Sequence, residues 1–249
     1  MRKGRLAHLL VFVVFLAAGG GLASALPSSL PGSASASLAL KGLIDQNLVR
    51  AEIVTSTDRL HDYLVDRGVV SKLRGNLLSL READGFIRTV NLSPLTRIKL
   101  DGRRVAARRV VPGLRATVMR DGSAAASWLY VFKKGADTTG PLIKALLATG
   151  FVRAEVVAQN AGQLGNSLAD TGVIQSVGGT SLTLTEADGT SPDIPIDSSA
   201  LVQVNIRMAD IGSLVAGMPA TVIQHGDGSP TQIWAVGKPA SRLRTGTRG

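Results

Sequence analysis

Apolar and polar residues alternate along much of the chain, and this period of two predicts β-strands that bury one face. The segments LLSLR (77–81) and SLTLT (181–185) show the alternation clearly. Each segment leads into the residues EADG, at 82–85 and 186–189, and Asp-Gly readily adopts the left-handed conformations of a tight turn. The sequence therefore predicts a β-hairpin at each EADG.

The two hairpins belong to an internal repeat with a period of about 104 residues. Residues 68–119 align with 172–223 without a gap, and more than a quarter of the aligned positions are identical. The segment LVRAEIV (48–54) matches FVRAEVV (151–157) at a slightly smaller offset. We therefore expect the chain to hold two copies of one structural unit.

Open strand edges promote aggregation, and a small β unit removes them by closing into a barrel. The sequence therefore predicts an all-β protein of two tandem small barrels, each of about six to eight strands. Repeat 1 covers residues 41–135, a short linker covers 136–140, and repeat 2 covers 141–240. Within each copy, the segments 105–112 and 209–216 are expected to form a turn or a single helical turn.

The segments that carry the repeat also resemble a known family. GVVSKLRGNLLSL and GLRATVM in the first copy, with GVIQSVGGTSLTL and GMPATVI in the second, are similar to a family of bacterial exported domains of unknown function with a small OB-like β-barrel. The likeness covers about 50 residues of each copy. It implies that each barrel is OB-like, and it implies no activity.

Both ends of the chain differ in composition from the repeats. Residues 1–25 combine a basic start, an apolar run over 6–18 and the small residues Ala23–Ala25, which predicts a secretory signal peptide. An uncleaved membrane anchor is the alternative. Residues 26–40 are expected to be a flexible linker, and 241–249 a basic tail. The chain contains no cysteine, which excludes disulfides and a lipid anchor on cysteine, and export without disulfides favours a bacterial extracytoplasmic protein.

The two copies carry opposite net charges, because basic residues prevail in 41–135 and acidic residues in 141–240. Such asymmetry indicates a partner. Arginine donates paired hydrogen bonds to phosphate and carboxylate groups. Candidate ligand-binding residues are the six arginines of one short segment, of which only the first aligns with a basic residue in the second copy: Arg103, Arg104, Arg108, Arg109, Arg115 and Arg120.

For an exported protein, the anionic partner of these arginines would be a cell-wall polymer or lipid headgroups. Nucleic acid is an unfavoured partner, because single-strand binding surfaces interleave aromatic with basic residues and this segment has no aromatic residue. Two other interpretations stay open: a solvated face, or a pairing of these arginines with the acidic second copy.

Few residues suggest catalysis. Beyond the signal peptide the only histidines are His61 and His225, at non-equivalent positions of the repeat, and both are interpreted as surface or hydrogen-bonded residues. No nucleophile, phosphate-loop or metal motif is present, so the sequence predicts no catalytic residue, no metal site and no cofactor.

Two further pairs of residues repeat between the copies. VRAE places Arg50 two residues from Glu52, and again places Arg153 two residues from Glu155. Residues two apart on a strand share a face, so each pair is expected to form a structural ion pair with a neighbouring strand. Trp128 matches Trp234 at a slightly larger offset, and both are expected to close the barrels. A stacking surface for sugar or base is the alternative for these tryptophans.

The leading interpretation is an exported, non-enzymatic binding or scaffolding protein that contacts anionic cell-envelope components through the basic first repeat. One alternative is a hydrolase of envelope material with a site between the repeats, near His61 or His225. Another is a purely structural protein–protein interaction module.

Overall fold

The computed structural model describes residues 44, 47–133, 146, 150–226 and 231–238. The predicted signal peptide (1–25), the linkers (26–40 and 136–140) and the basic tail (241–249) lie outside the described residues.

The described part of the chain is all-β, as the alternation predicts. The first copy contains β1 (Leu48–Ser56), β2 (Leu60–Arg74), β3 (Leu77–Arg81), β4 (Ile87–Leu100), β5 (Arg103–Arg104), the 3-10 helix η1 (Ala107–Arg109), β6 (Arg115–Asp121) and β7 (Ala126–Phe132). The second contains β8 (Phe151–Asn160), β9 (Gln163–Val177), β10 (Ser181–Glu186), β11 (Asp193–Pro195), β12 (Leu201–Val204), β13 (Arg207–Ala209), the 3-10 helix η2 (Ile211–Ser213), β14 (Pro219–His225) and β15 (Gln232–Ala235). The two 3-10 helices confirm the single helical turns expected in 105–112 and 209–216.

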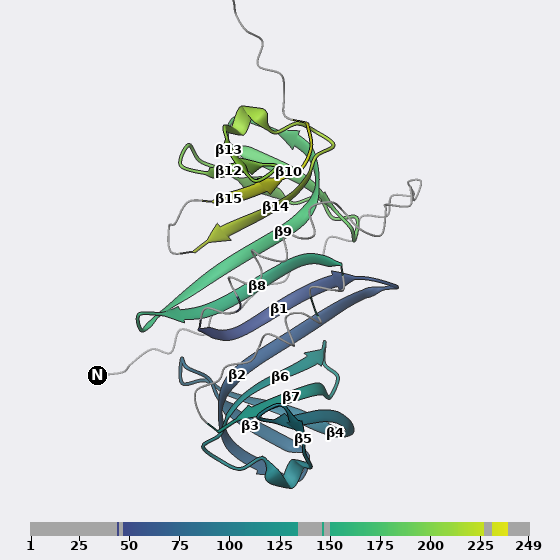
Figure 1. Ribbon diagram of the computed structural model, residues 1–249, viewed down its shortest axis with the longest axis vertical. Coiled ribbons are helices and arrows are strands. Elements are labelled where there is room, and N and C mark those ends of the chain that lie inside the picture. Colours follow the sequence, from purple (N-terminus) through teal and green to yellow (C-terminus); the bar gives the residue numbers. More distant parts are fainter. Residues whose placement is uncertain (1–43, 45–46, 134–145, 147–149, 227–230, 239–249) are drawn as a thin grey trace, which may run out of the picture.

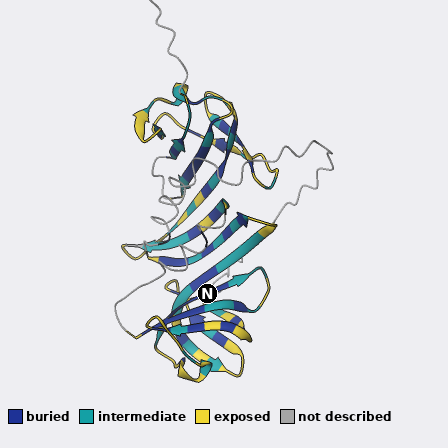
Figure 2. Cartoon of the chain, turned by 45° about the vertical axis from the view of Figure 1, so that its right-hand side comes forward, coloured by how far each residue is buried: buried dark blue, intermediate teal, exposed yellow. Residues whose placement is uncertain are grey.

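Five strands of the first copy close into a ring. β2 pairs with β3, β3 with β4, β4 with β7, β7 with β6, and β6 pairs again with β2. Only the β4–β7 pairing is parallel. Aliphatic side chains at alternate positions fill the inside of the ring, among them Leu78, Leu80, Val118 and Leu129, none of which is exposed at all. Along the ring strands, buried positions therefore alternate with exposed ones (Figure 2).

The second copy repeats these pairings with one interruption. β9 pairs with β10 and β14, β14 with β15, and β15 runs parallel to β12. The strand equivalent to β4 is divided into β11 and β12, which are separated by residues 196–200. Among the described strands β11 pairs only with β10, and Pro195 lies on this edge strand.

The two EADG turns are equivalent, which confirms the repeated hairpin. The amide of Gly85 donates to the carbonyl of Glu82 (3.0 Å), and the amide of Gly189 donates to the carbonyl of Glu186 (3.1 Å). Both glycines have a φ of +84°, a conformation that favours glycine.

Another aligned glycine pair allows a close strand crossing. A Cβ atom on Gly68 would lie 2.3 Å from the carbonyl oxygen of Arg81, and one on Gly172 would lie 2.5 Å from that of Thr185. Only glycine fits where β2 and β9 coil this tightly over the next strand.

A continuous sheet joins the copies, because β1 and β8 lie outside the rings and pair with each other. The central order is β2-β1-β8-β9, with the first ring at one end of an elongated molecule and the interrupted ring of the second copy, called the second ring below, at the other (Figure 1). The β1–β8 register is symmetric, since Arg50 lies opposite Val157 while its equivalent Arg153 lies opposite Val54. The copies are thus related by an approximate two-fold axis through the middle of this pairing, and one sheet runs through both.

The strand register shows that Trp128 and Trp234 are not equivalent residues of the repeat, so their predicted equivalence is wrong. Ile98 pairs with Leu129 in the first copy, and Val202 pairs with Ile233 in the second, so the offset of 104 continues into the last strands. The equivalent of Trp234 is therefore Tyr130. Trp128 is half-buried and packs against the apolar cluster on one face of the central sheet, which includes Ile53, Val65, Met119 and Val156.

Candidate functional site

The structure separates the six predicted arginines into three places. Arg103 and Arg104 form β5, Arg108 and Arg109 lie on η1, and all four are exposed at the free end of the first ring (Figure 1). Arg115 begins β6 and is also exposed. Arg120, at the other end of β6, is half-buried, and its guanidinium lies 3.5 Å from the carboxylate of Asp66. We therefore remove Arg120 from the candidate binding residues.

Strand register brings further basic residues onto the outer face of the same ring. Lys99 on β4 lies between Arg104 on β5 and Tyr130 on β7, and Arg97 lies beside Trp128. The Arg97 guanidinium is 4.8 Å from the Trp128 ring centre, and the Lys99 ammonium is 5.7 Å from that of Tyr130. These cation–π contacts hold two positive charges against a stacked aromatic pair.

A second row of basic residues crosses β3, β2 and β6. Val69 pairs with Arg81 on one side and with Arg115 on the other, and Arg67 shares its face because it precedes Val69 by two residues. We call six of the basic residues on the outer side of the first ring the basic face: Arg67, Arg81, Arg97, Lys99, Arg104 and Arg115.

The second ring has no basic face. At an offset of 104, the six positions hold neutral residues: Thr171, Thr185, Leu201, Gln203, Met208 and Pro219. The strands around them are the same, so the fold does not require the charges. Sequence reasoning missed Arg67, Arg81, Arg97 and Lys99 because they are scattered along the chain. The available signal is a basic residue on the polar side of a strand that aligns with a neutral residue in the other copy.

Each copy also contains a buried ionic cluster, which we call the polar plug, at the end of the ring beside the central sheet. In the first copy Arg50 donates to Glu82 and to Asp84, both at 2.7 Å. Arg88 lies 3.2 Å from Asp66 and 3.5 Å from Glu82. The arginine of VRAE thus pairs with the carboxylates of EADG, and the expected involvement of Glu52 is wrong.

The polar plug of the second copy has the same acids and fewer bases. Arg153 lies 2.5 Å from Glu186 and 2.5 Å from Asp188. Pro192 and Gln224 replace the arginines that stand at positions 88 and 120 of the first copy. Burial raises the pKa of Glu186 to about 7, outweighing its contacts with Thr190 and Arg153, and burial also raises the pKa of the neighbouring Asp170. Both carboxyl groups therefore retain a proton to higher pH than an isolated carboxyl group does, in the place where the first copy has additional arginines.

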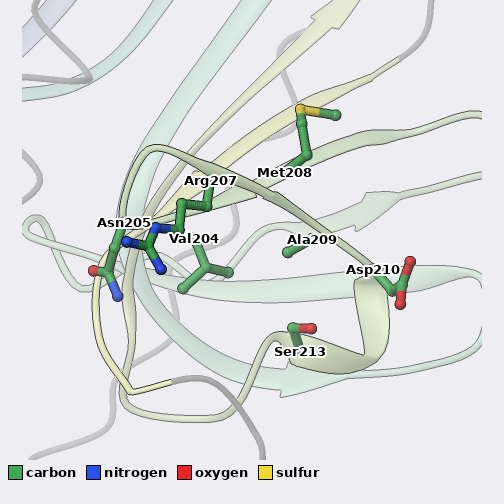
Figure 3. A pocket seen from close by; sticks show the side chains of 7 residues that line it. All are labelled: Val204, Asn205, Arg207, Met208, Ala209, Asp210 and Ser213. Atoms are coloured by element: carbon green, nitrogen blue, oxygen red, sulfur yellow. The ribbon is translucent and has the colours of Figure 1, made fainter.

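A hollow in the second ring lies on the β12–β13 hairpin and η2. Its volume is about 780 Å³, with Arg207 and Asn205 on one side and Asp210 and Ser213 on the other (Figure 3). Three of its lining positions align with the arginine-rich segment of the first copy: Arg207, Met208 and Ser213. One arginine remains there, so this site lacks the positive charge of the first ring.

The histidines do not form a recognisable catalytic group. His61 Nδ1 lies 2.8 Å from Asp121, whose hydrogen bond raises the histidine pKa, and the ring stacks on Tyr63. His225 Nδ1 lies 3.0 Å from Ser167 Oγ, and its Nε2 faces the amide of Gln232 at 3.3 Å. A serine hydrolase needs a carboxylate to orient the histidine, and an amide occupies that place.

Two features are absent from the described residues. They contain no group of three or more His, Asp or Glu side chains arranged to hold a metal ion. They also contain no helix that is long and apolar enough to cross a membrane.

Comparisons with known proteins identify no relative. No protein-family model matches the chain, and neither curated proteins nor solved structures give a significant match. The resemblance to exported domains of unknown function stays a prediction.

Proposed function

We propose that the protein is an extracytoplasmic, non-enzymatic binding protein whose first ring holds a phosphate-bearing anionic polymer of the cell envelope. One observation carries the proposal. The core, the hairpins and the polar plug are common to both rings. The basic face and the four exposed arginines at the free end of the ring, Arg103, Arg104, Arg108 and Arg109, occur as a group only in the first. Selection for folding alone would not place basic side chains on one ring and neutral ones at the same positions of the other.

The charges are available to an external ligand. Arg103, Arg104, Arg108 and Arg109 are exposed, and among the described residues no ion pair joins them to an acidic side chain. They lie at the end of the molecule farthest from the second ring (Figure 1). This placement favours an external partner over docking of these arginines on the acidic second copy of the same chain.

We further propose that each ring is a small OB-like barrel. The ring order is first, second, third, fifth and fourth strand, so the last two strands exchange places as in a Greek key. In the first copy the β2–β6 pairing closes the ring.

The test is co-sedimentation with isolated cell envelope. Replacing Arg103, Arg104, Arg108 and Arg109 with Ser should weaken binding severalfold, and wild-type binding should fall as salt rises because exposed charges are screened within about 8 Å at physiological ionic strength. A control removes exposed charges outside the first ring, at Arg59, Arg207 and Lys238. Equal loss in both variants, or binding that ignores salt, would reject the proposed function.

A further inference from the structure

A cavity of about 310 Å³ opens where the first ring meets the central sheet. It lies between β2, β3 and β6 and the adjoining ends of β1 and β8. Its walls include three arginines and two amide side chains: Arg67, Arg81, Arg115, Asn47 and Gln159.

The three arginines come from three adjacent strands. Arg81 and Arg115 are cross-strand neighbours of Val69, one on each side, and Arg67 lies two residues earlier on the same face. The strand pairing therefore fixes the spacing of the arginines, which is a condition for recognising one ligand group.

The one acidic residue in the lining does not cancel this charge. The carboxylate of Glu82 is fully buried and accepts a hydrogen bond from Arg50 at 2.7 Å, while its second oxygen lies 3.5 Å from Arg88. Both arginines belong to the polar plug and lie outside the cavity lining. Glu82 is therefore paired within the polar plug, and Arg81 and Arg115 remain exposed at the cavity.

The fold does not need these arginines. At an offset of 104, Thr171, Thr185 and Pro219 replace them in the second copy, although the surrounding strands pair in the same register. The positive charge of the cavity is specific to the first copy.

We propose that this cavity binds the phosphate group of a phosphorylated polyol. Several guanidinium groups can bind one phosphate group, because a phosphate offers more acceptor oxygens than a carboxylate. The volume exceeds what one phosphate group fills, and the amides of Asn47 and Gln159 can both donate to and accept from hydroxyl groups. The inference deepens the proposed function, on which it rests, because it assigns a subsite for one unit of the polymer.

The experiment is calorimetric titration of the full chain with glycerol 3-phosphate, using glycerol and inorganic phosphate as the other two probes. Wild-type protein should bind glycerol 3-phosphate more tightly than phosphate and should not bind glycerol. Arg81→Thr, which introduces the residue of the second copy, should weaken binding at least tenfold. Arg81→Lys keeps the charge without the fork and should weaken it less.

The matched control is Lys72→Thr, which removes an exposed charge from β2 outside the cavity and should leave affinity unchanged. Circular dichroism confirms that each variant is folded. Absence of binding by wild type, equal losses in Arg81→Thr and Lys72→Thr, or equal affinity for inorganic phosphate would overturn the inference. The variant with Ser at positions 103, 104, 108 and 109 separates the two proposals, because its envelope binding should weaken severalfold while its affinity for glycerol 3-phosphate is unchanged.

Discussion

Glu52 and Glu155 lie directly opposite each other in the β1–β8 pairing, although both are acidic. They are equivalent residues of the two copies, so the approximate two-fold axis places them together. Burial raises the pKa of Glu52, and the nearby charges of Asp62 and Glu155 raise it further. Asn166 donates a hydrogen bond to Glu155 at 3.1 Å, which stabilises one of the two carboxylates.

We expect Glu52→Gln to stabilise the protein at pH 8 by about 0.5 kcal/mol, because like charges directly opposite on a sheet repel. A raised pKa in the folded state means that stability is lost as pH rises and the carboxyl group ionises. The gain should therefore shrink towards pH 4. Urea denaturation at both pH values measures it, and a gain that does not depend on pH would contradict the electrostatic explanation.

Removing the arginine of the VRAE motif should lower the free energy of unfolding by different amounts in the two copies. Arg153→Ala leaves Glu186 without a basic partner among the described residues, whereas Arg50→Ala leaves Glu82 with Arg88. We expect a loss of about 2 kcal/mol for Arg153→Ala at pH 8 and about 1 kcal/mol for Arg50→Ala, which allows for the partial exposure of both arginines. Chemical denaturation of the two variants tests this order. Equal losses would show that Arg88 does not compensate.

The stability of the second copy should fall as pH rises through about 7. Glu186 has a folded-state pKa of about 7, above the ordinary value of 4.5, so the folded state holds an extra proton between these values and loses stability as that proton dissociates. Arg153, Asp170, Asp188 and Thr190 are the charged and polar groups around it.

Melting temperatures from pH 5 to 9 test this expectation, with Glu186→Gln as the matched variant. The glutamine variant cannot ionise, so its melting temperature should decline less over this range than that of wild type. Identical pH profiles would exclude Glu186 as the responsible group.

The glycines at the strand crossings should not tolerate a methyl group. Gly68→Ala and Gly172→Ala would each bring Cβ within 2.5 Å of a backbone carbonyl oxygen, so we expect each to cost at least about 2 kcal/mol. Gly165→Ala is the control, because its Cβ would meet nothing within 4 Å. Similar melting temperatures for all three variants would contradict the tight crossing.

The β4–β5 and β12–β13 hairpins are equivalent, and the residues at their tips, a glycine and an isoleucine, can be exchanged between the copies. Gly102 has a φ of +81° in the first copy, and its equivalent Ile206 has a φ of +69° and is 88% exposed. Ile206→Gly should stabilise the protein by about 1 kcal/mol and Gly102→Ile should destabilise it by a similar amount, since left-handed backbone is unfavourable for a β-branched residue. Thermal denaturation measures both changes, and a loss of stability in Ile206→Gly would show that the isoleucine makes a compensating contact.

Local patterns predicted the hairpins, the strand period and the repeat, because turn residues and alternation act over a few neighbouring positions. They could not predict that β1 pairs with β8, because alternation shows which face of a strand is buried and not which strand lies beside it. The same limit explains the error over VRAE. Arg50 reaches a turn 32 positions away, and only the tertiary structure shows that the two repeated motifs form one ionic cluster.

The candidate site was predicted in part. The dense arginine segment was visible in the sequence, but Arg81 and Arg115 come together only through Val69 in the sheet. Conversely, Arg120 belongs to the same segment and lies on the opposite side of β6 in an internal ion pair.

The symmetric β1–β8 pairing has an evolutionary consequence. Each strand presents the same edge to the other, which is how two identical subunits form an isologous homodimer. Joining both subunits in one polypeptide preserves this interface and ends the requirement that they be identical. The first copy can then have an arginine at position 81 while the second has a threonine at the equivalent position 185. A homodimer encoded by a single sequence cannot have such a difference between its subunits.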